Sequence, residues 1–269
     1  METQLIWPMR RRLAQLFAII AITLLIGVPA QAITPQRFTA AVTAAKEKMA
    51  SDPDGVIAMI STLRNEGSLR DPIQVATLDW LEGEALVRTA RPERGLALLG
   101  RARAVTQARQ PGGLLEADIL LSQGGALTDS NRITEGLRAL QRAHDLFAAN
   151  GENRGRARAL ILIALLYSGA RDYSAALRYF EQARDAYAGD TGLLVAIDNG
   201  RAGALAGLHR PAEAAHAYDQ ALSSARRMGS PPVLAAVLGN LADARLRAGQ
   251  SVAARNALSQ GFLVARDPR

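Results

Sequence analysis

Apolar residues recur at three- and four-residue spacing along most of the chain, which is the pattern of helices with one buried face. The segment 159–190 shows it most clearly, because it contains two such helices separated by a glycine-containing turn at 169–172. The apolar positions of the two helices are Leu160, Ala164 and Tyr167, followed by Ala176, Phe180 and Ala183. The pattern therefore predicts a hairpin of two packed helices.

The same arrangement of small and large residues recurs along the chain. A small residue begins the buried face of each expected second helix, at intervals of 38 to 41 residues. These residues are Gly55, Gly95, Gly136, Ala176, Ala214 and Ala254, of which the first belongs to a weaker copy that continues with Met59. The first helices carry small residues at Gly83, Gly124, Ala164, Ala202 and Ala242. Two helices approach closely only where side chains are small, so we expect the paired helices to cross at these positions.

This unit resembles the tetratricopeptide repeat, whose first helix carries a large, a small and an aromatic residue and whose second carries alanine, aromatic and alanine. The standard unit has about 34 residues. A period near 40 resembles the longer subclass found in kinesin light chains and in many bacterial sensory and regulatory proteins. The resemblance implies one domain at residues 33–269, an all-α, right-handed α-solenoid of about six stacked helix-turn-helix hairpins. Stacking is required because a single hairpin cannot bury both of its faces.

Composition supports this fold class and narrows the function. Apolar residues make up 49% of the chain, and they are mostly alanine and leucine, which are strong helix formers. The chain has no cysteine, which excludes disulfides, thiolate metal sites and cysteine nucleophiles. Its net charge of +7 comes from arginines scattered between acidic residues. That distribution indicates a solvated surface and does not fit binding of nucleic acid.

Residues 1–32 have the three-part order of a secretory signal peptide. Three arginines precede an uncharged apolar run at 16–28, and Ala30 and Ala32 supply the small residues that signal peptidase needs. We therefore expect cleavage after Ala32 and a periplasmic or secreted protein of the exported bacterial type. The apolar run is short for a membrane span of about 20 residues. An uncleaved signal that anchors the chain is the alternative, and it is the only membrane attachment that we expect.

No pattern in the sequence indicates an active site. The three histidines, His144, His209 and His216, have no pair of carboxylates at ligand spacing and are interpreted as surface or turn residues. The paired glycines lack the lysine and the strand-to-helix context of a phosphate-binding loop. A Gly-x-Ser-x-Gly nucleophile elbow is also missing. We therefore predict neither catalysis nor a bound cofactor nor a metal site.

The family resemblance places candidate binding residues on the first helices, which line the concave side of such arrays. The family often has asparagines there that bind the backbone of an extended peptide, since an amide both donates and accepts hydrogen bonds. Asn199 and Asn240 lie at or near these positions. Arg158 and Arg247 are candidates for binding a carboxylate, and Trp80 for an aromatic contact with a ligand. Packing between repeats is the alternative role, above all for Trp80.

These features predict an interaction module or scaffold that binds a peptide or protein partner in its concave groove. The alternative is a sensor input domain, related to the arrays of membrane-bound diguanylate cyclases and histidine kinases, that lacks its output domain. No second hydrophobic span follows the repeats, which favours the interaction module. The sequence pattern gives the class of partner but not its identity.

Overall fold

The computed structural model describes residues 33–66, 69–187 and 189–266, and within these ranges it contains twelve α-helices and no strand. The helices are α2 (Pro35–Lys48), α3 (Pro53–Glu66), α4 (Pro72–Arg88), α5 (Pro92–Arg109), α6 (Leu114–Asp129), α7 (Ile133–Ala149), α8 (Asn153–Gly169), α9 (Tyr173–Ala186), α10 (Thr191–Gly207), α11 (Pro211–Met228), α12 (Pro231–Arg247) and α13 (Ser251–Arg266). Each even-numbered helix pairs with the next helix, and the six hairpins stack in chain order. This confirms the all-α solenoid of helix-turn-helix hairpins.

The predicted signal peptide at 1–32 lies outside the described residues, so cleavage after Ala32 stays a prediction. In the part of the chain that is described, no helix is both long enough and apolar enough to cross a membrane.

Five of the hairpins share one turn geometry. A single residue in each turn has a positive φ between 58° and 76°, and these residues are Ala90, Asn131, Arg171, His209 and Gly249. The N–H of the residue that follows donates to the carbonyl five positions back, as from Arg91 to Leu86 at 2.9 Å. This bond satisfies a carbonyl that the end of the helix would otherwise leave free. The repeat seen in the sequence is therefore also a repeat of backbone conformation.

Small residues bring the paired helices together backbone to backbone. A Cβ atom placed on Gly95 of α5 would lie 2.7 Å from the carbonyl oxygen of Gly83 of α4. Gly124 and Gly136 meet in the same way where α6 crosses α7, with a carbonyl oxygen 3.0 Å from a Cβ placed on Gly136. Alanines replace the glycines in the later hairpins, and Ala164, Ala176, Ala202 and Ala214 are fully buried. The predicted crossing positions are confirmed in these four hairpins.

The first hairpin differs from the prediction. Gly55 and Met59 are only half-buried, and the buried face of α3 lies one residue later. It consists of Val56, Ile60 and Leu63. Because a valine stands where later hairpins have glycine or alanine, α3 has no small residue on its buried face at the crossing position. Helix α2 packs less extensively on α3 than the paired helices of any later hairpin do on each other.

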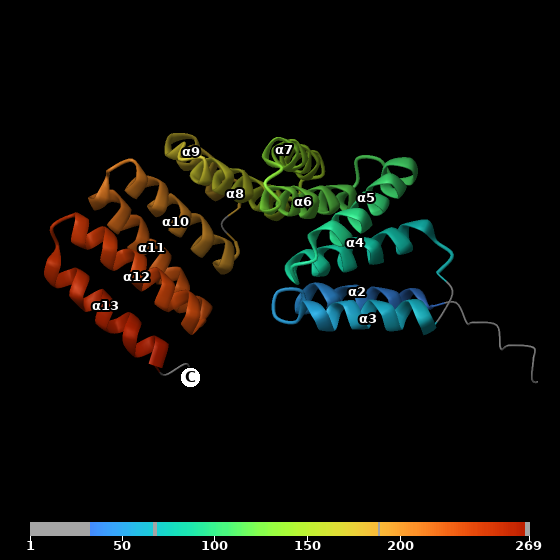
Figure 1. Cartoon of the computed structure of the whole chain (residues 1–269), viewed down its shortest axis with the longest axis horizontal. Helices are drawn as coiled ribbons and strands as arrows, with labels where there is room; N and C mark the ends of the chain where they lie inside the picture. The colour runs from blue at the N-terminus through green and yellow to red at the C-terminus, as the bar shows by residue number, and fades with distance from the viewer. Residues whose placement is uncertain (1–32, 67–68, 188, 267–269) are drawn as a thin grey trace, which may run out of the picture.

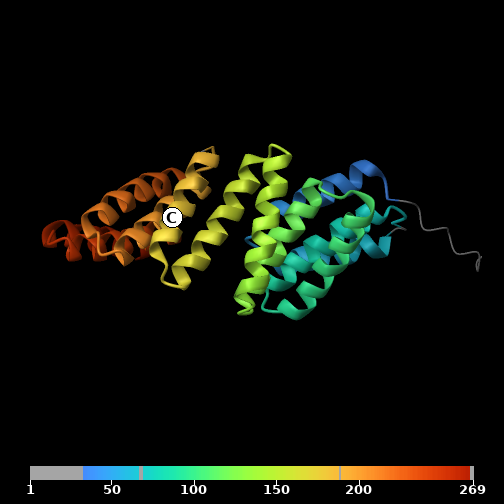
Figure 2. The same ribbon diagram turned by 90° about the horizontal axis from the view of Figure 1, so that it is seen from above.

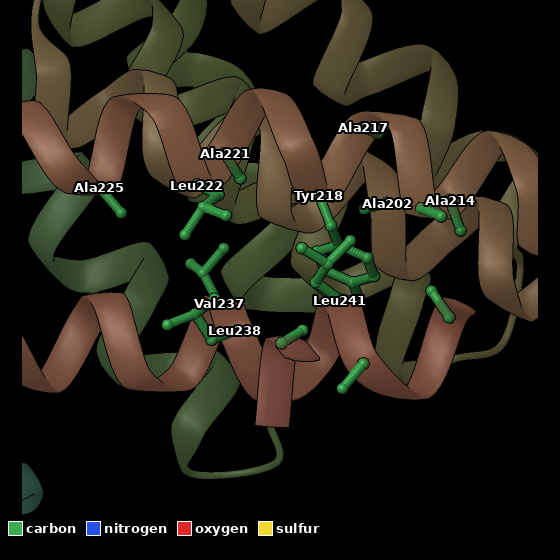
Figure 3. Close-up of a cluster of buried hydrophobic side chains, with 14 of the residues drawn as sticks. Ala202, Ala214, Ala217, Tyr218, Ala221, Leu222, Ala225, Val237, Leu238 and Leu241 are labelled. Atoms are coloured by element: carbon green, nitrogen blue, oxygen red, sulfur yellow. The ribbon is translucent and has the colours of Figure 1, made fainter. Parts of the chain in front are cut away.

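Side chains between neighbouring hairpins form the core. Figure 3 shows Tyr218 and Leu222 of α11 facing Val237, Leu238 and Leu241 of α12. In α13 the predicted small position, Ala254, is buried, whereas Leu258 four residues later is 48% exposed. Leu258 occupies the large position of the second-helix pattern, but α13 is the last helix and leaves it largely exposed.

The hairpins follow an arch, with α4, α6 and α8 on its inner side and α5, α7 and α9 on its outer side (Figure 1). Each of α2, α4, α6 and α8 contacts the next even-numbered helix as well as its own hairpin partner. Figure 2 shows the same arch from above, with the hairpins following one another along the long axis. Helices α2, α4, α6, α8 and α10 therefore form a continuous inner layer, which is where the resemblance places the binding residues.

Candidate functional site

A groove with a volume of about 760 Å³ lies in the first half of the inner layer. Its walls are the C-terminal end of α2, the inner face of α4 and the N-terminal parts of α6 and α8. The apolar part of the lining includes Met49, Ile73, Leu114, Leu115 and Phe147. The charged part consists of Lys46, Glu84, Arg88, Asp118, Glu152, Arg154 and Arg158. The groove thus combines an apolar surface with charges of both signs.

A chain of hydrogen bonds links α4 to α6 in the wall of this groove. The Nε1–H of Trp80 donates to Oγ of Ser122 at 3.0 Å, and that oxygen lies 3.1 Å from Oε2 of Glu84. The other oxygen of Glu84 accepts from Nη2 of Arg88, also at 3.1 Å. Trp80 is only 5% exposed. Its N–H joins two neighbouring repeats through the bond to Ser122, and its ring lines the groove.

Asp118 is the carboxylate of the groove with the weakest internal partner. Burial raises its pKa, as do the nearby carboxylates of Glu84 and Glu152, whereas Lys46 and Arg158 oppose the increase. Among the described residues, none donates a hydrogen bond to its side chain, and the nearest guanidinium nitrogen, on Arg158, lies 3.9 Å away. Asp118 therefore keeps an unused capacity to accept hydrogen bonds inside the groove.

The structure places the predicted arginines in different surroundings. Arg158 lines the groove and is half-buried, with no hydrogen bond to Asp118. Its neighbour Arg154 is paired with Asp190 at 2.8 Å. Arg247 lies far along the chain on α12, where it is exposed and paired with Asp243 at 2.8 Å. Arg158 is thus part of the groove, and Arg247 is not.

The two predicted asparagines contact each other. Nδ2 of Asn240 on α12 donates to Oδ1 of Asn199 on α10 at 3.0 Å. Asn199 stands three residues before the crossing residue of its helix and Asn240 stands two before, which is the same register as Trp80 and Ser122. Equivalent hydrogen bonds therefore join neighbouring inner helices near both ends of the array. Within the described part of the chain, the amide nitrogen of Asn199 and the amide oxygen of Asn240 have no hydrogen-bond partner.

Two buried ion clusters were missed by the sequence reasoning. Asp79 of α4, with 7% of its side chain exposed, pairs with Arg64 at 2.6 Å and with Arg101 at 3.1 Å. Asp198 of α10, with 3% exposed, pairs with Arg184 and Arg201. Both acids stand four residues before the crossing position, where α6, α8 and α12 carry a leucine. An acidic residue in an otherwise apolar column of the repeat is the signal that could have revealed them.

The described residues contain no group of three histidine, cysteine, aspartate or glutamate side chains that could hold a metal ion. His209 has a turn position with a positive φ of 58°, and Nδ1 of His144 lies 3.1 Å from the carboxylate of Asp145.

Comparison with known proteins shows which family has this architecture. Residues 115–188, which span α6 to α9, match the family model of the tetratricopeptide repeat. No curated protein sequence matches the chain.

Solved structures resemble the chain over most of its length. BtubC (BKLC) from P. vanneervenii is 16% identical with a TM-score of 0.67, and the match covers 83% of this chain and 91% of that one. The apo form of the quorum sensor NprR from B. thuringiensis is 14% identical with a TM-score of 0.70, covering 96% and 72%. A Rap protein complexed with competence and sporulation factor is 11% identical with a TM-score of 0.68, covering 88% and 67%.

At these identities the structural matches show the fold alone. Together with the family-model match, they agree with the repeat of small residues, turn conformations and stacked hairpins described above. Residues 115–188 thus match the tetratricopeptide repeat, and the described chain as a whole has the fold of a tetratricopeptide-like helical solenoid.

Proposed function

We propose that the protein is an exported interaction module that binds an extended segment of a peptide or protein partner along its inner, concave face. The observation that carries this proposal is the groove of about 760 Å³, which four consecutive even-numbered helices help to form. It offers apolar surface beside hydrogen-bonding groups that the chain leaves partly unused. A site for a peptide needs this mixture, because peptides carry apolar side chains and a polar backbone.

The structural neighbours support a peptide as the class of ligand. One neighbour is a Rap protein complexed with competence and sporulation factor, and another is NprR in complex with its cognate peptide NprX. The NprR complex is 14% identical with a TM-score of 0.61, and the match covers 96% of this chain and 74% of that one. At least one protein with a similar fold thus forms a complex with a peptide, and we extend peptide binding to this chain.

At the far end of the inner face, the asparagine pair is the proposed contact for the backbone of the bound peptide. Asn199 retains its amide donors and Asn240 its amide oxygen, so together they can accept from and donate to a peptide backbone. Each such bond contributes about 0.5–1.5 kcal/mol net. Arg158 in the groove, and Arg247 at the end of α12, are the proposed contacts for acidic groups of the partner.

The proposed export depends on the signal peptide predicted at residues 1–32. We propose that residues 1–32 direct the chain out of the cytoplasm and are removed after Ala32, so that residues 33–269 function in the periplasm or outside the cell. The partner would then be another exported polypeptide.

Site-specific photo-crosslinking in the producing cell tests the proposal. Leu165 is 51% exposed and follows the crossing residue of α8, the same register as Glu84 in the groove, so a benzoylphenylalanine there faces the inner side. Met228, 46% exposed at the end of α11, is the matched control. We expect a crosslinked polypeptide from position 165 and none from position 228. Equal crosslinking at both positions, or none at position 165, would count against a partner on the concave face.

A further inference from the structure

The groove already holds one ammonium group, which the chain itself supplies. Nζ of Lys46, near the end of α2, lies 4.9 Å from the centroid of the Trp80 ring. Among the described residues this ammonium forms no salt bridge, although it is close enough to Asp118 to favour the charged form of that carboxylate. A cation over an aromatic face is stabilised by the electron density of the ring.

The surroundings of this ammonium suit a cation that can donate hydrogen bonds. The Trp80 ring forms one wall, and the carboxylates of Glu84 and Asp118 lie in the same groove. Glu84 is held in place by Ser122 and Arg88, whereas Asp118 accepts no hydrogen bond from the described residues. Burying an ionised carboxylate without a hydrogen bond is unfavourable. Lys46 and Arg158 lie near Asp118 but donate no hydrogen bond to it, so a ligand cation that did donate would remove this cost.

Lys46 belongs to the element of the groove that is held least firmly. Helix α2 buries Ala45, and Met49 at its C-cap, and its packing on α3 is the least extensive of the six hairpins. The lysine side chain is also long and exposed. Its ammonium can therefore leave the ring for solvent without disturbing the core, whereas Trp80, Glu84 and Asp118 are fixed on α4 and α6.

We propose that this groove selects a lysine or arginine side chain of the bound peptide, which replaces the Lys46 ammonium over Trp80 and donates to Asp118. The inference rests on the proposed function, because it names the side chain that the peptide groove recognises. Lys46 then acts as an internal competitor that occupies the site when no ligand is bound. An acidic side chain at the same place would be repelled by the carboxylate of Asp118.

Tryptophan fluorescence reports on this site directly. The sequence contains two tryptophans, Trp7 and Trp80, and Trp7 lies in the proposed signal peptide, so Trp80 is the single reporter in residues 33–269. Three capped pentapeptides that differ only in the central residue, lysine, norleucine or glutamate, serve as probes. We expect the lysine peptide to bind most tightly and to change the emission of Trp80, because only its ammonium can lie over the ring.

Substitutions separate the two parts of the proposal. Lys46→Met should tighten binding of the lysine peptide by about threefold to tenfold, since the internal competitor for the aromatic face is gone. Asp118→Asn should weaken binding by about tenfold, because a hydrogen bond to a charged acceptor is lost, whereas Asp118→Glu should retain most of the affinity. Lys48→Met is the matched control, because Lys48 is exposed on the same helix outside the groove. It should change nothing.

Each remaining outcome has a definite meaning. If the glutamate peptide binds as tightly as the lysine peptide and changes Trp80 emission, the charge selection is wrong while a peptide groove remains. If Lys46→Met weakens binding, Lys46 is a ligand contact and not a competitor. If no probe binds although position 165 crosslinks a partner, this end of the groove is not the recognition site. If crosslinking fails as well, the proposed function falls with the inference. Thermal melts of the variants confirm that each compared protein is folded.

Discussion

Because α4 and α5 cross closely, we expect opposite changes in stability when alanine replaces two glycines of the same helix. Gly95 faces Gly83 at the crossing, whereas Gly100, five residues later, is exposed, and an added Cβ there would have no atom within 4 Å apart from its chain neighbours and the backbone of its own helix. Alanine is preferred over glycine inside a helix by roughly 1 kcal/mol. Replacing either glycine by alanine therefore brings the same gain in helix propensity, and only the surroundings of the new methyl group differ.

The expected magnitudes follow from the contacts. At Gly95 the methyl carbon would lie 2.7 Å from the Gly83 carbonyl oxygen and 3.2 Å from the backbone nitrogen of Val87, and backbone atoms cannot move aside as side chains can. Overpacking of this kind costs about 1–3 kcal/mol or more. After subtraction of the gain in propensity, Gly95→Ala should lower the free energy of unfolding by up to about 2 kcal/mol. Gly100→Ala should raise it by about 0.5–1 kcal/mol.

Urea unfolding monitored by circular dichroism measures both effects on the same chain. Because repeat arrays can unfold in parts, hydrogen exchange of α4 and α5 should accompany the melts to show that the change originates in this hairpin. Faster exchange confined to α4, α5 and their neighbours is expected for Gly95→Ala. If Gly95→Ala stabilises the protein as much as Gly100→Ala does, the crossing is looser than described and the argument from small residues fails.

Three further predictions address charge and processing. Asp198→Leu, which restores the leucine of other repeats, should leave the free energy of unfolding unchanged or raise it by about 1–4 kcal/mol. Arg184→Ala should lower it by about 1–2 kcal/mol, because Asp198 stays buried with one partner fewer. Urea melts measure both effects. Burial raises the folded-state pKa of Asp118, so its contribution to stability is present below the ordinary pKa of 3.8 and is lost as pH rises through the raised value. Asp118→Asn should thus be more stable than the wild type at neutral pH, with a difference that disappears on acidification below that window, as melts across pH will show. N-terminal sequencing of the exported protein should begin at residue 33, and recovery of residues before Ala32 would refute cleavage there.

The repeat could be predicted in detail because its packing is local. The crossing residues of a hairpin lie about twelve positions apart in sequence, as Gly83 and Gly95 do, and their period near 40 shows the number of units. The first hairpin was placed one residue too early because Gly55 and Met59 imitate the pattern, whereas the buried face begins at Val56. Apolar residues in this helix allow two registers, one that buries Gly55 and Met59 and one that buries Val56 and Ile60. Packing against α4 selects the second register.

The candidate site was predicted only in outline. The concave register places Trp80 and Arg158 on the inner surface, where both line the groove, but it left open whether each residue contacts a ligand or packs between repeats. The structure shows that Trp80 is bonded to Ser122 and that Asn199 is bonded to Asn240. These partners are about 40 residues apart, so their contact depends on how one hairpin stacks on the next.

The sequence by itself determined the all-α class, the repeated hairpin and the close crossings, since these follow from side-chain size and spacing within one unit. Only the tertiary structure decided which polar groups on the inner face satisfy each other and which remain open. Asp118 and Lys46 come from helices separated by three others in the chain, and their meeting in one groove depends on the stacking of whole hairpins. Hydrogen bonds form or fail over tenths of an ångström, and the spacing of residues along the chain does not define distances between stacked helices at that scale.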